Sequence, residues 1–428
     1  MGRAAVVGGG VLGLAVAREL SERGDEVTLF EAAPEIGGLA SAWSLGDIVW
    51  DRHYHVILAS DSRTRALLDW VGLDQEVVWK TTRTGFYAGE TYGLRSATSP
   101  LEMLRLPSLS PIDTMRIGAT VVAGSRITDG TPLEDIPVAD WLRRRSGGKA
   151  FDRFWVPLLR AKLGTAWTDT SAAFIWATMR RLTAARRAGL SEERFGYVPG
   201  GAARIFDAVA TKLTHEGVKL LTSTPVIAVQ SNGLDQVVVT EQGSERFDRV
   251  VVTTAAPLAA RLCLDLTDAE RNRLRSVRYQ GVVCASMLLP QRLADYYLTY
   301  ITDGATPFTA VVEMTSFVDP AELGGKHLVY LPKYVSPEDP IFEASDEELR
   351  FQYSRYLQRM YPHFDPSQIE AFEVSRVRQV YAIPTLGYSR TMPSTTTSIP
   401  SLQLLGSANL PFSTLNMNDT LSLVDELR

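Results

Sequence analysis

The hydropathy pattern at the start of the chain predicts a strand, a helix and a second strand in close succession. Residues 4–7 (AAVV) are a short apolar run with β-branched valines, which is typical of a buried parallel strand. Residues 12–24 (LGLAVARELSERG) place apolar side chains at helical spacing and end at a glycine. Residues 26–31 (EVTLFE) are a second apolar run that ends on Glu31. This order predicts a βαβ unit.

Apolar runs that predict further buried strands recur far along the chain, at residues 216–228, at 248–257 and at the start of 402–420. Residues 195–210 combine a Pro-Gly-Gly turn with an amphipathic helix. Residues 402–420 continue from their strand through a turn at Gly406 into the start of a helix. These segments predict that one domain is assembled from separated parts of the sequence.

Two long segments lie between these strands. Residues 81–190 are expected to be mainly helical. Residues 280–380 alternate apolar strands with one long amphipathic helix at 346–362, which predicts a mixed sheet covered by a helix. The predicted fold class is therefore α/β, with an α+β part built on the mixed sheet.

Composition narrows the class of protein. The 428 residues are 45% hydrophobic and 22% charged, and the net charge is −5, so the chain lacks the pervasive positive charge that nucleic-acid binding requires. No run reaches the ~18 apolar residues of a membrane span, and no signal peptide is recognised at the start. The only two cysteines, Cys263 and Cys284, stand in apolar surroundings, as in a reducing compartment. We expect a cytoplasmic protein that acts on a small molecule, and leave its oligomeric state open.

The glycines after the first strand predict a dinucleotide site. Gly8, Gly10 and Gly13 fit the pattern G-x-G-x-x-G inside the βαβ unit. Gly8 would form the tight turn, Gly10 would let the backbone approach a pyrophosphate, and Gly13 would let helix and strand pack closely. Glu31, at the end of the second strand, is placed to bind ribose hydroxyls. The alternative is a glycine-rich turn with no ligand.

The residues that follow carry a family resemblance. Residues 32–43 (AAPEIGGLASAW) hold the pair Gly37 and Gly38 just after the acidic residue. Here the chain resembles the flavoprotein superfamily of amine oxidases, protoporphyrinogen oxidases and phytoene desaturases, in which such a pair lines the FAD pyrophosphate. The resemblance implies FAD as the cofactor. Leu39 stands where most members carry arginine or asparagine, which weakens assignment to any one branch.

The resemblance also implies cofactor contacts at later positions. In the superfamily the residue that matches Val226 touches the adenine through its backbone. The segment that matches residues 416–419, with Asn416, Met417 and Asn418, lies beside the flavin pyrimidine ring after the turn at Gly406. Its amides and helix dipole would stabilise negative charge on the reduced flavin. The alternative for this last segment is an asparagine-rich helix cap.

With this resemblance the whole chain is divided into three interleaved parts. A Rossmann-type FAD-binding domain is expected to be discontinuous, and a helical insertion and a substrate-binding mixed sheet interrupt it. The FAD-binding domain comprises residues 1–80, 191–279 and 381–428, the helical insertion residues 81–190, and the mixed sheet residues 280–380.

Residues 51–57 (DRHYHVI) contain two of the five histidines. In a strand, Asp51, His53 and His55 would share one face. A metal site would need further ligands that the other histidines do not supply, so no metal is predicted. The segment resembles the superfamily's D-x-G-x-H strand, with His53 in the place of glycine, and His55 matches the flavin-side histidine of UDP-galactopyranose mutases. The resemblance implies that His55 and His53 are catalytic candidates, and simple packing is the alternative.

Substrate contacts are predicted from two other segments. Arg160 and Lys162 (LLRAKLG) resemble the basic, glycine-ended segment of the mutases. Tyr381 and Tyr388 lie in a stretch that also holds Arg376, Arg378 and Arg390, which together favour a polar substrate. The lysine that amine oxidases hold near the flavin is missing from residues 278–290, and Lys333 is out of place for that role.

Three functions remain open at this point. The favoured one is FAD-dependent oxidation of a small organic substrate by hydride transfer to flavin N5. The first alternative is a sugar-nucleotide isomerase like the UDP-galactopyranose mutases, which uses reduced FAD without net redox change. The second is a catalytically inactive flavin-binding protein.

Overall fold

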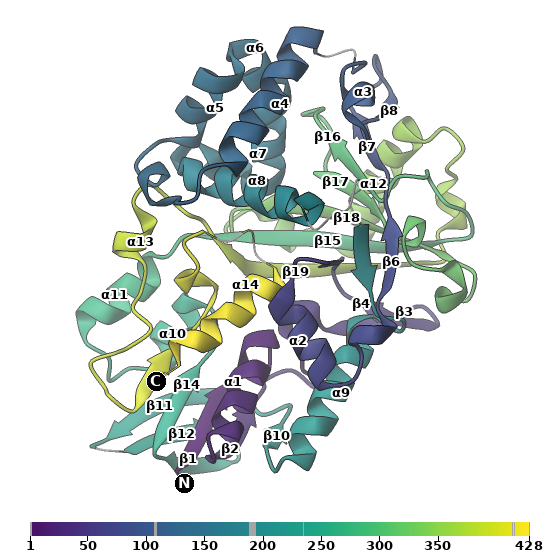
Figure 1. The fold of residues 1–428 in the computed structure, drawn as a ribbon. Coiled ribbons are helices and arrows are strands. Elements are labelled where there is room, and N and C mark those ends of the chain that lie inside the picture. Colours follow the sequence, from purple (N-terminus) through teal and green to yellow (C-terminus); the bar gives the residue numbers. More distant parts are fainter. Residues whose placement is uncertain are drawn as a thin grey trace.

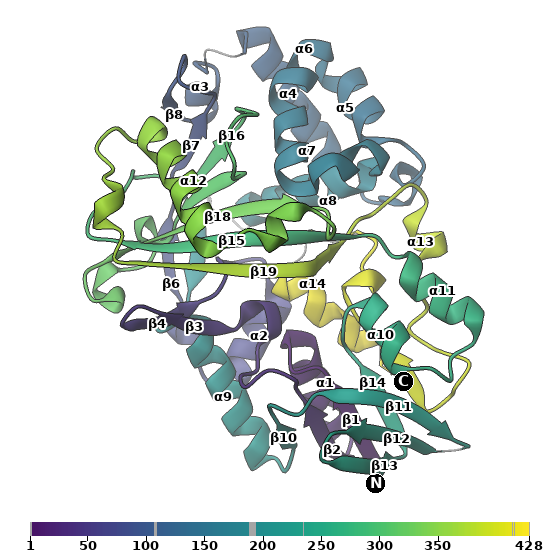
Figure 2. The same ribbon diagram turned by 180° about the vertical axis from the view of Figure 1, so that it is seen from behind.

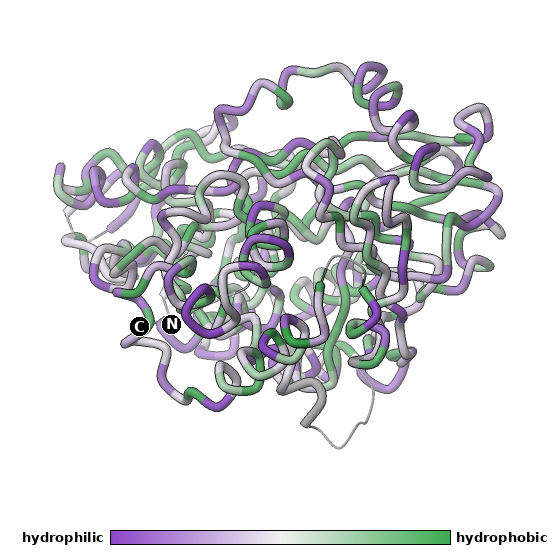
Figure 3. The backbone as a smooth tube through the Cα atoms, turned by 90° about the horizontal axis from the view of Figure 1, so that it is seen from above, coloured by the Kyte–Doolittle hydropathy of each residue, from purple (hydrophilic) through white to green (hydrophobic). Residues whose placement is uncertain are grey.

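The fold is built on a parallel sheet at one end and a larger mixed sheet across the middle (Figure 1). The structure is a computed structural model that describes residues 2–106, 109–187, 194–233, 235–412, 414 and 416–427. In this description the mixed sheet lies between the parallel sheet and a group of helices at the opposite end (Figure 1). Viewed from above, hydrophobic and hydrophilic stretches alternate along the backbone, as expected for amphipathic elements around shared cores (Figure 3).

The parallel sheet confirms the predicted βαβ unit. Strand β1 (Arg3–Val7) pairs in parallel with β2 (Glu26–Phe30) on one side and β14 (Arg249–Val252) on the other, and α1 (Val11–Glu22) connects the first two. The outer strands are β10 (Lys219–Leu221) and β20 (Leu402–Leu404). Ala4 and Ala5, neighbours on β1, belong to different hydrophobic clusters, so the sheet is covered on both faces. The carboxyl ends of these strands, where α/β sheets bind ligands, carry Gly8 and Glu31.

Two elements cover the faces of the parallel sheet. Helix α9 (Gly201–His215) packs with α1 on one face. A three-stranded antiparallel sheet covers the other, with β11 (Val226–Asn232), β12 (Asp235–Thr240) and β13 (Gly243–Phe247) in sequence order. The sequence pattern predicted one strand over 216–228, which is wrong: the chain leaves β10, turns, and enters β11 in a different sheet.

The mixed sheet has seven strands in the order β19-β15-β18-β17-β16-β7-β8. Strand β15 (Tyr279–Leu289), between β19 and β18, is buried along its whole length because helices cover both faces. Helix α12 (Asp346–Met360) covers one face (Figure 2), and the other packs against the helices of residues 111–187. The remaining strands are β19 (Ala371–Ala382), β18 (His327–Val335), β17 (Ala310–Glu313), β16 (Leu298–Ile301), β7 (Thr84–Tyr87) and β8 (Leu94–Ser96).

Residues 81–190 are helical only in part. Strands β7 and β8 belong to the mixed sheet, so the expectation of a helical segment is wrong for residues 84–96. The helices that follow are α3 (Pro100–Met103), α4 (Pro111–Ser125), α5 (Val138–Ser146), α6 (Gly148–Ala150), α7 (Val156–Leu163) and α8 (Ala172–Arg187). The proposed boundary between residues 190 and 191 lies outside the described residues.

The histidine-containing segment is a loop and not a strand. Strand β4 (Ile48–Asp51), which pairs with β3 (Ala42–Leu45), ends on the aspartate, and β5 (Ile57–Leu58) begins two residues after His55. The prediction that Asp51, His53 and His55 alternate along one strand face is therefore wrong. The loop carries the chain from the β3–β4 hairpin to β5, which belongs to a different sheet. In that sheet β9 (Arg194–Tyr197) lies between β5 and β6 (Val78–Thr81) and pairs with both.

Shorter helices complete the description. They are α2 (Ser62–Trp70), α10 (Ala256–Leu262), α11 (Asp268–Ser276), α13 (Tyr388–Thr391) and α14 (Met417–Leu421). Among the described residues, no helix combines the length and apolar character that crossing a bilayer requires.

Gly13 tests the close packing of α1 on the glycine turn. A Cβ added there would lie 1.8 Å from the carbonyl oxygen of Gly8, whereas one added at Gly118, also in a helix, meets nothing within 4 Å. We expect Gly13→Ala to lower the free energy of unfolding by about 3 kcal/mol and to reduce FAD retention. Gly118→Ala should raise stability by up to about 1 kcal/mol. Thermal melts and the flavin absorbance of both variants check this, and equal behaviour of the two would contradict it.

Candidate functional site

Two glycine turns meet backbone to backbone at the end of the parallel sheet. The amide of Gly37 donates to the carbonyl oxygen of Gly9 at 2.8 Å, and Gly10 and Gly37 form an isolated parallel bridge. Gly37 and Gly38 have φ of 107° and 59°, and a Cβ on Gly38 would lie 3.0 Å from the Cα of Gly10. The positive φ values and the close contacts favour glycine at Gly37 and Gly38, whereas a Cβ on Gly10 would meet nothing closer than 3.9 Å. The structure thus brings together the two motifs that the sequence placed separately.

Glu31 is fixed at the rim of these turns. Its carboxylate accepts hydrogen bonds from the amides of Gly9, at 2.5 Å, and Ala33, at 2.8 Å. The backbone of Glu31 also joins the segment after β10, because its amide donates to Leu221 and its carbonyl oxygen accepts from Thr224. Val226 follows two residues later at the start of β11. Glu31, the candidate ribose contact, is therefore linked by a backbone hydrogen bond to a residue two positions before Val226, the candidate adenine contact.

The C-terminal segment reaches the same end of the sheet. Leu405 donates its amide to Val252 on β14, and Gly406 follows with extended backbone, where a Cβ would lie 3.1 Å from the carbonyl oxygen of Thr254. The Thr254 hydroxyl is buried and has no hydrogen-bond partner in the described part of the chain. Gly406 therefore stands beside a polar group without a partner.

Helix α14 begins where the sequence placed a helix start. Asn416 caps it, because its side-chain oxygen accepts from the amide of Asp419 at 2.9 Å. The side-chain oxygen of Asn418 accepts from the amide of Arg63 at 2.9 Å, which ties α14 to α2, and Met417 packs against the core of the parallel sheet. The cap role of Asn416 and a place beside the flavin are compatible, since capping leaves other helix amides exposed.

The histidine loop follows directly from the glycine pair. The Nδ1 atom of His53 lies 2.9 Å from the carbonyl oxygen of Leu39, next to Gly38. Burial lowers the pKa of His53 to about 4, assisted by the charge of Arg52, and burial with the nearby His53 lowers the pKa of His55 to about 4. Both imidazoles are therefore neutral at pH 7. Within the described residues, His53 Nε2 and His55 Nδ1 are buried without a hydrogen-bond partner.

Asp51 holds the start of this loop between two elements. Its carboxylate accepts from the amide of Ala202 at 2.7 Å, at the beginning of α9, and its carbonyl oxygen accepts from the hydroxyl of Tyr330 on β18 at 2.6 Å. Gly201, with φ of 70°, leaves room for the carboxylate, since a Cβ there would lie 2.6 Å from it. Burial raises the pKa of Asp51 to about 7.

A chain of three polar side chains connects the loop to the mixed sheet and to the helices. The hydroxyls of Tyr54 and Tyr334 are 3.0 Å apart, and Lys162 on α7 donates from Nζ to the Tyr334 hydroxyl at 3.1 Å. Burial and the neighbouring Tyr334 raise the pKa of Tyr54 well above its ordinary value, so it remains protonated. We call these three residues the Tyr–Lys patch. One residue comes from the histidine loop, one from α7 and one from β18, and Tyr334 lies between the other two.

The remaining substrate candidates are distributed differently. Arg160 is exposed on α7, away from the patch. Tyr381 is buried on β19 beside Gln280, and burial together with the nearby Tyr388 and Asp419 raises its pKa. Tyr388 donates its hydroxyl to the carbonyl oxygen of Ala408 at 2.8 Å, in the hydrophobic cluster between the parallel sheet and the three-stranded sheet. Of the four predicted substrate residues, only Lys162 lies in the patch.

The arginines near Tyr381 do not face it. Arg376 is 2.6 Å from Asp346, at the start of α12, and Arg378 pairs with Glu343. Arg390 pairs with Asp135 at the surface. Lys333 shares a face of β18 with Val329, Leu331 and Val335, and these three side chains pack on the α12 side of the sheet. The three arginines are thus paired elsewhere, and Lys333 lies on the face of β18 opposite to Tyr334.

The sequence did not single out Tyr54, Tyr330, Tyr334 or Gln280 as site residues. Tyr330 and Tyr334 are four residues apart on a strand and so share a face, which is a signal that could have been used. Gln280 is fully buried on β15, and its amide nitrogen has no partner among the described residues. Tyr54 lies between His53 and His55, and no motif in the sequence distinguishes it from them.

The residues present fit FAD. The open backbone at Gly10 and the carboxylate of Glu31 suit a pyrophosphate and a ribose. The partnerless polar atoms of His53, His55, Gln280 and Thr254 require a polar neighbour that the described protein does not supply. A bound flavin offers such groups on its ring.

Comparisons with known proteins agree with this geometry. The family model described as flavin containing amine oxidoreductase matches residues 13–412. A carotenoid phi-ring synthase of Streptomyces griseus is 30% identical over 289 residues, which are 60% of this chain and 53% of that protein. The chain thus matches about half the length of this curated relative.

Solved structures share the fold over nearly the whole chain. A reduced UDP-galactopyranose mutase has a TM-score of 0.78 at 16% identity, covering 100% of this chain and 95% of its own. A putrescine oxidase bound to putrescine has a TM-score of 0.76 at 16% identity, covering 99% and 97%. At these identities the likeness shows the fold alone.

The raised pKa of Asp51 predicts a pH-dependent stability difference. The folded state keeps the proton up to about pH 7, whereas the unfolded state releases it near pH 4, so Asp51 contributes stability that is lost as pH rises between these values. Asp51→Asn keeps an acceptor for Ala202 and cannot ionise. Between pH 5 and pH 8, urea unfolding should shift in favour of the variant, relative to wild type, by roughly 2 kcal/mol.

The control for this shift is Asp47→Asn. Asp47 is exposed, and its pKa is lowered by the hydrogen bond from Lys326, so this variant should show no gain toward pH 8. The same pH trend in both variants, or none in Asp51→Asn, would refute the assignment of the buried carboxyl.

Proposed function

The chain belongs to the family of flavin-containing amine oxidoreductases, and we propose that it is an FAD-dependent oxidoreductase that oxidises a small organic substrate held by the Tyr–Lys patch. Bound FAD would supply the oxidising chemistry by accepting a hydride at N5. The observation that carries this proposal is the hydrogen-bonded series Tyr54, Tyr334 and Lys162. The series begins at Tyr54, next to His53, and ends at Lys162 on α7.

We propose the following contacts for the cofactor. Its pyrophosphate would lie against the two glycine turns, and its adenosine end near Glu31 and Val226. The flavin would lie toward Gly406 and α14, with Asn416, Met417 and Asn418 at its pyrimidine side. The exposed amides at the start of α14 would favour negative charge there. Gly8 and Gly13 act only by allowing the backbone to pack.

The neutral histidines have a separate proposed role. A neutral imidazole can donate from one nitrogen and accept at the other without adding charge beside the flavin. His55, with its partnerless Nδ1, would orient the substrate or the flavin edge. His53, held by the Leu39 carbonyl oxygen, would fix the course of the loop.

The Tyr–Lys patch favours some substrates over others. Lys162 is half-buried and presents its cation to Tyr334, whose hydroxyl is 3.1 Å and whose ring centroid is 4.2 Å from Nζ. A neutral or anionic acceptor group, such as a carbonyl or carboxylate, would be stabilised there. A protonated amine would be repelled, so we propose that the substrate is not a cation at its bound polar end.

The sugar-nucleotide isomerase alternative has less support from the geometry. It requires arginines for a diphosphate, and Arg376 and Arg378 are paired beside α12 while Arg160 points to solvent. The alternative keeps the shared fold of the mutase as its support. An inactive flavin-binding protein is the third outcome.

One anaerobic experiment separates these functions. The purified yellow protein is mixed with panels of carboxylates, ketones, alcohols, amines and sugar nucleotides, first oxidised and then after reduction. Bleaching of the oxidised flavin by a substrate supports the proposed oxidation. Turnover only after reduction, without consumption of reductant, would support the isomerase. The absence of either over the whole panel would contradict both, and a protein that takes up no FAD would contradict the site itself.

Lys162 and Tyr334 should matter for turnover more than for cofactor binding. Lys162→Met and Tyr334→Phe each remove a hydrogen bond involving a charged group, which is worth about 1.5–3 kcal/mol, so kcat/KM should fall by roughly 10- to 100-fold while FAD stays bound. The control is Lys333→Met, next to Tyr334 on the opposite face of β18. An equal loss in the control variant would show that the patch has no special role.

His55 gives an independent test of the loop. His55→Ala should retain FAD but change the flavin absorbance maximum or the turnover rate, because it removes a neutral hydrogen-bonding group from the proposed flavin edge. His363→Ala, on an exposed turn, should leave both unchanged. Wild-type kinetics together with a wild-type spectrum in His55→Ala would rule out the assignment.

A further inference from the structure

Strand β15 is buried on both faces, but only one of its faces carries polar side chains. The face toward α12 is apolar and consists of Val283, Ala285, Met287 and Leu289. A Cβ on Gly281 would meet the ring of Phe342 on that same side, so Gln280 points to the other face. Cys284 and Ser286 share this other face, toward the helical insertion. A strand buried on both faces is normally apolar throughout, so these polar residues require an explanation.

Gln280 places an unpaired amide beside the end of helix α7. The residue is 1% exposed, and its Nε2 atom has no hydrogen-bond partner in the described part of the chain. Gly164, which ends α7 with φ of 56°, leaves room for the amide, because a Cβ there would lie 3.1 Å from Nε2. Lys162 precedes Gly164 by two residues, so the amide lies near the end of the helix that carries the cation of the Tyr–Lys patch.

The neighbouring strands place Gln280 between the Tyr–Lys patch and helix α14. On one side, Tyr334 pairs with Val282, two residues from Gln280 on the same face of the sheet. On the other side, Tyr381 pairs directly with Gln280. Burial raises the pKa of Tyr381, and the nearby Tyr388 and Asp419, the latter on α14, add to this rise. Because α14 is the proposed flavin contact, Gln280 stands between the expected positions of flavin and substrate.

The groups on the substrate side of this position are hydrogen-bond donors. The ammonium group of Lys162 has no carboxylate within ion-pair distance in the described residues, and its printed partner is the hydroxyl of Tyr334. The amide nitrogen of Gln280 carries two further N–H groups. A carboxylate has about four lone-pair sites and no donor, so it would satisfy both residues, whereas a cationic group would satisfy neither.

We propose that Gln280 is a specificity-determining residue that donates a hydrogen bond from its amide to a carboxylate of the substrate, next to Lys162. This inference rests on the proposed function and narrows its substrate class to carboxylates. A glutamine suits the position because an uncharged amide supplies a donor at a depth where a second buried charge would be costly.

The test uses the oxidised, FAD-loaded full chain and three probes of similar shape. Benzoate is anionic, benzamide is neutral and benzamidine is cationic, and their binding is measured by flavin difference spectra and by titration calorimetry. We expect benzoate to bind at least about tenfold more tightly than benzamidine, with benzamide between them. Absence of benzoate binding, or tighter binding of benzamidine, would overturn the proposal, and this ranking requires no variant.

One substitution and a matched control locate the contact. Gln280→Met keeps the length of the side chain and removes the donor, so the dissociation constant of benzoate should rise by roughly 10- to 100-fold, as for a lost hydrogen bond to a charged group. Binding of benzamidine should change little. The control is Gln236→Met in the three-stranded sheet, where a buried glutamine donates to the Ser401 hydroxyl at 2.9 Å. This control should bind benzoate as wild type does.

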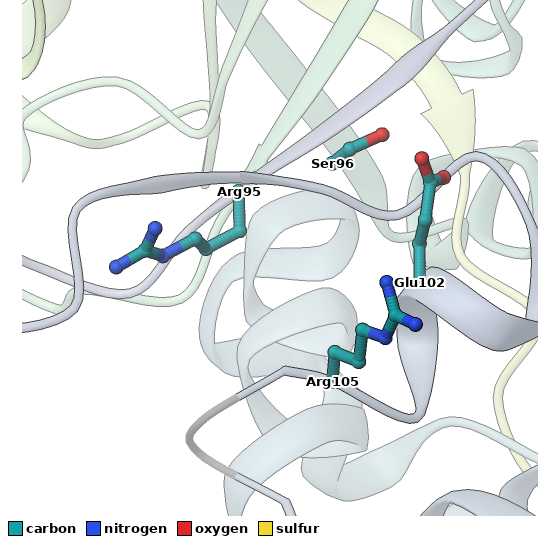
Figure 4. Close-up of a pocket in the computed structure, with 4 residues that line it drawn as sticks. All are labelled: Arg95, Ser96, Glu102 and Arg105. Atoms are coloured by element: carbon teal, nitrogen blue, oxygen red, sulfur yellow. The ribbon is translucent and has the colours of Figure 1, made fainter.

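A surface pocket offers a second place where an anionic probe could bind. It has a volume of about 330 Å³, lies between β8 and α3, and is lined by Arg95, Ser96, Glu102 and Arg105 (Figure 4). Arg95→Ala combined with Arg105→Ala should leave the affinity for benzoate unchanged. Loss of benzoate binding in this double variant would assign the anion site to the surface pocket and overturn the proposal.

The remaining outcomes separate a specific role of Gln280 from a structural one. Flavin absorbance and melting temperature establish that each variant is folded and loaded. Equal weakening of all three probes in Gln280→Met, or an equal loss of benzoate in Gln236→Met, would overturn the proposal. A shifted flavin spectrum in Gln280→Met with unchanged affinity for benzoate would assign the amide to the cofactor instead.

Probe binding is measured without turnover, so it is independent of the proposed oxidation. A substrate that bleaches the flavin of a protein that does not bind benzoate would support the oxidation and refute the role of Gln280. Benzoate bound through Gln280, with no substrate that bleaches the flavin, would support the anion site and contradict the oxidation.

Discussion

The contact between the two glycine turns is the constraint on which the rest of the site depends. Gly10 and Gly38 approach so closely that a single Cβ on Gly38 would be 3.0 Å from the other backbone. Because Gly38 carries no side chain, the backbone after β2 can lie directly against the backbone after β1, and the hydrogen bond from Gly37 to Gly9 fixes the two relative to each other. The β3–β4 hairpin begins four residues after Gly38, and the histidine loop follows the hairpin. The position of the loop is thus set by backbone contacts, which vary less than contacts between flexible side chains.

Burial decides the charge state of the loop that these contacts position. His53 and His55 are neutral at pH 7 because burial disfavours their charged forms, and Tyr54 stays protonated for the same reason. Lys162 supplies a cation within hydrogen-bond reach of this otherwise neutral group. Lys162 is half-buried, and Arg52, beside His53, is a second cation. The site therefore combines neutral hydrogen-bonding groups with two nearby positive charges.

The parts that the sequence predicted are those whose signals are local. The βαβ unit, the glycine motif and Glu31 lie within about thirty residues, and their periodicity and spacing suffice to place them. The strand prediction for Asp51, His53 and His55 failed because alternation over so few residues does not distinguish a strand from an extended loop. Strands β7 and β8 were missed because they are short and are stabilised by pairing with β16, more than two hundred residues away. The Tyr–Lys patch joins residues 54, 162 and 334, and no local sequence pattern predicts contacts between residues so far apart in the chain.

Helix α4 buries several polar residues beside Ile117 and leaves three large apolar side chains exposed, and the two sides have different costs. On the buried side the polar groups are satisfied locally, since Thr120 donates to the carbonyl oxygen of Arg116 and Thr114 to that of Ser110. Their burial therefore costs little. On the exposed side, Ile112, Met115 and Val122 have no compensating interaction with water, and hydration of each large apolar side chain is unfavourable by about 1.5–3 kcal/mol relative to full burial.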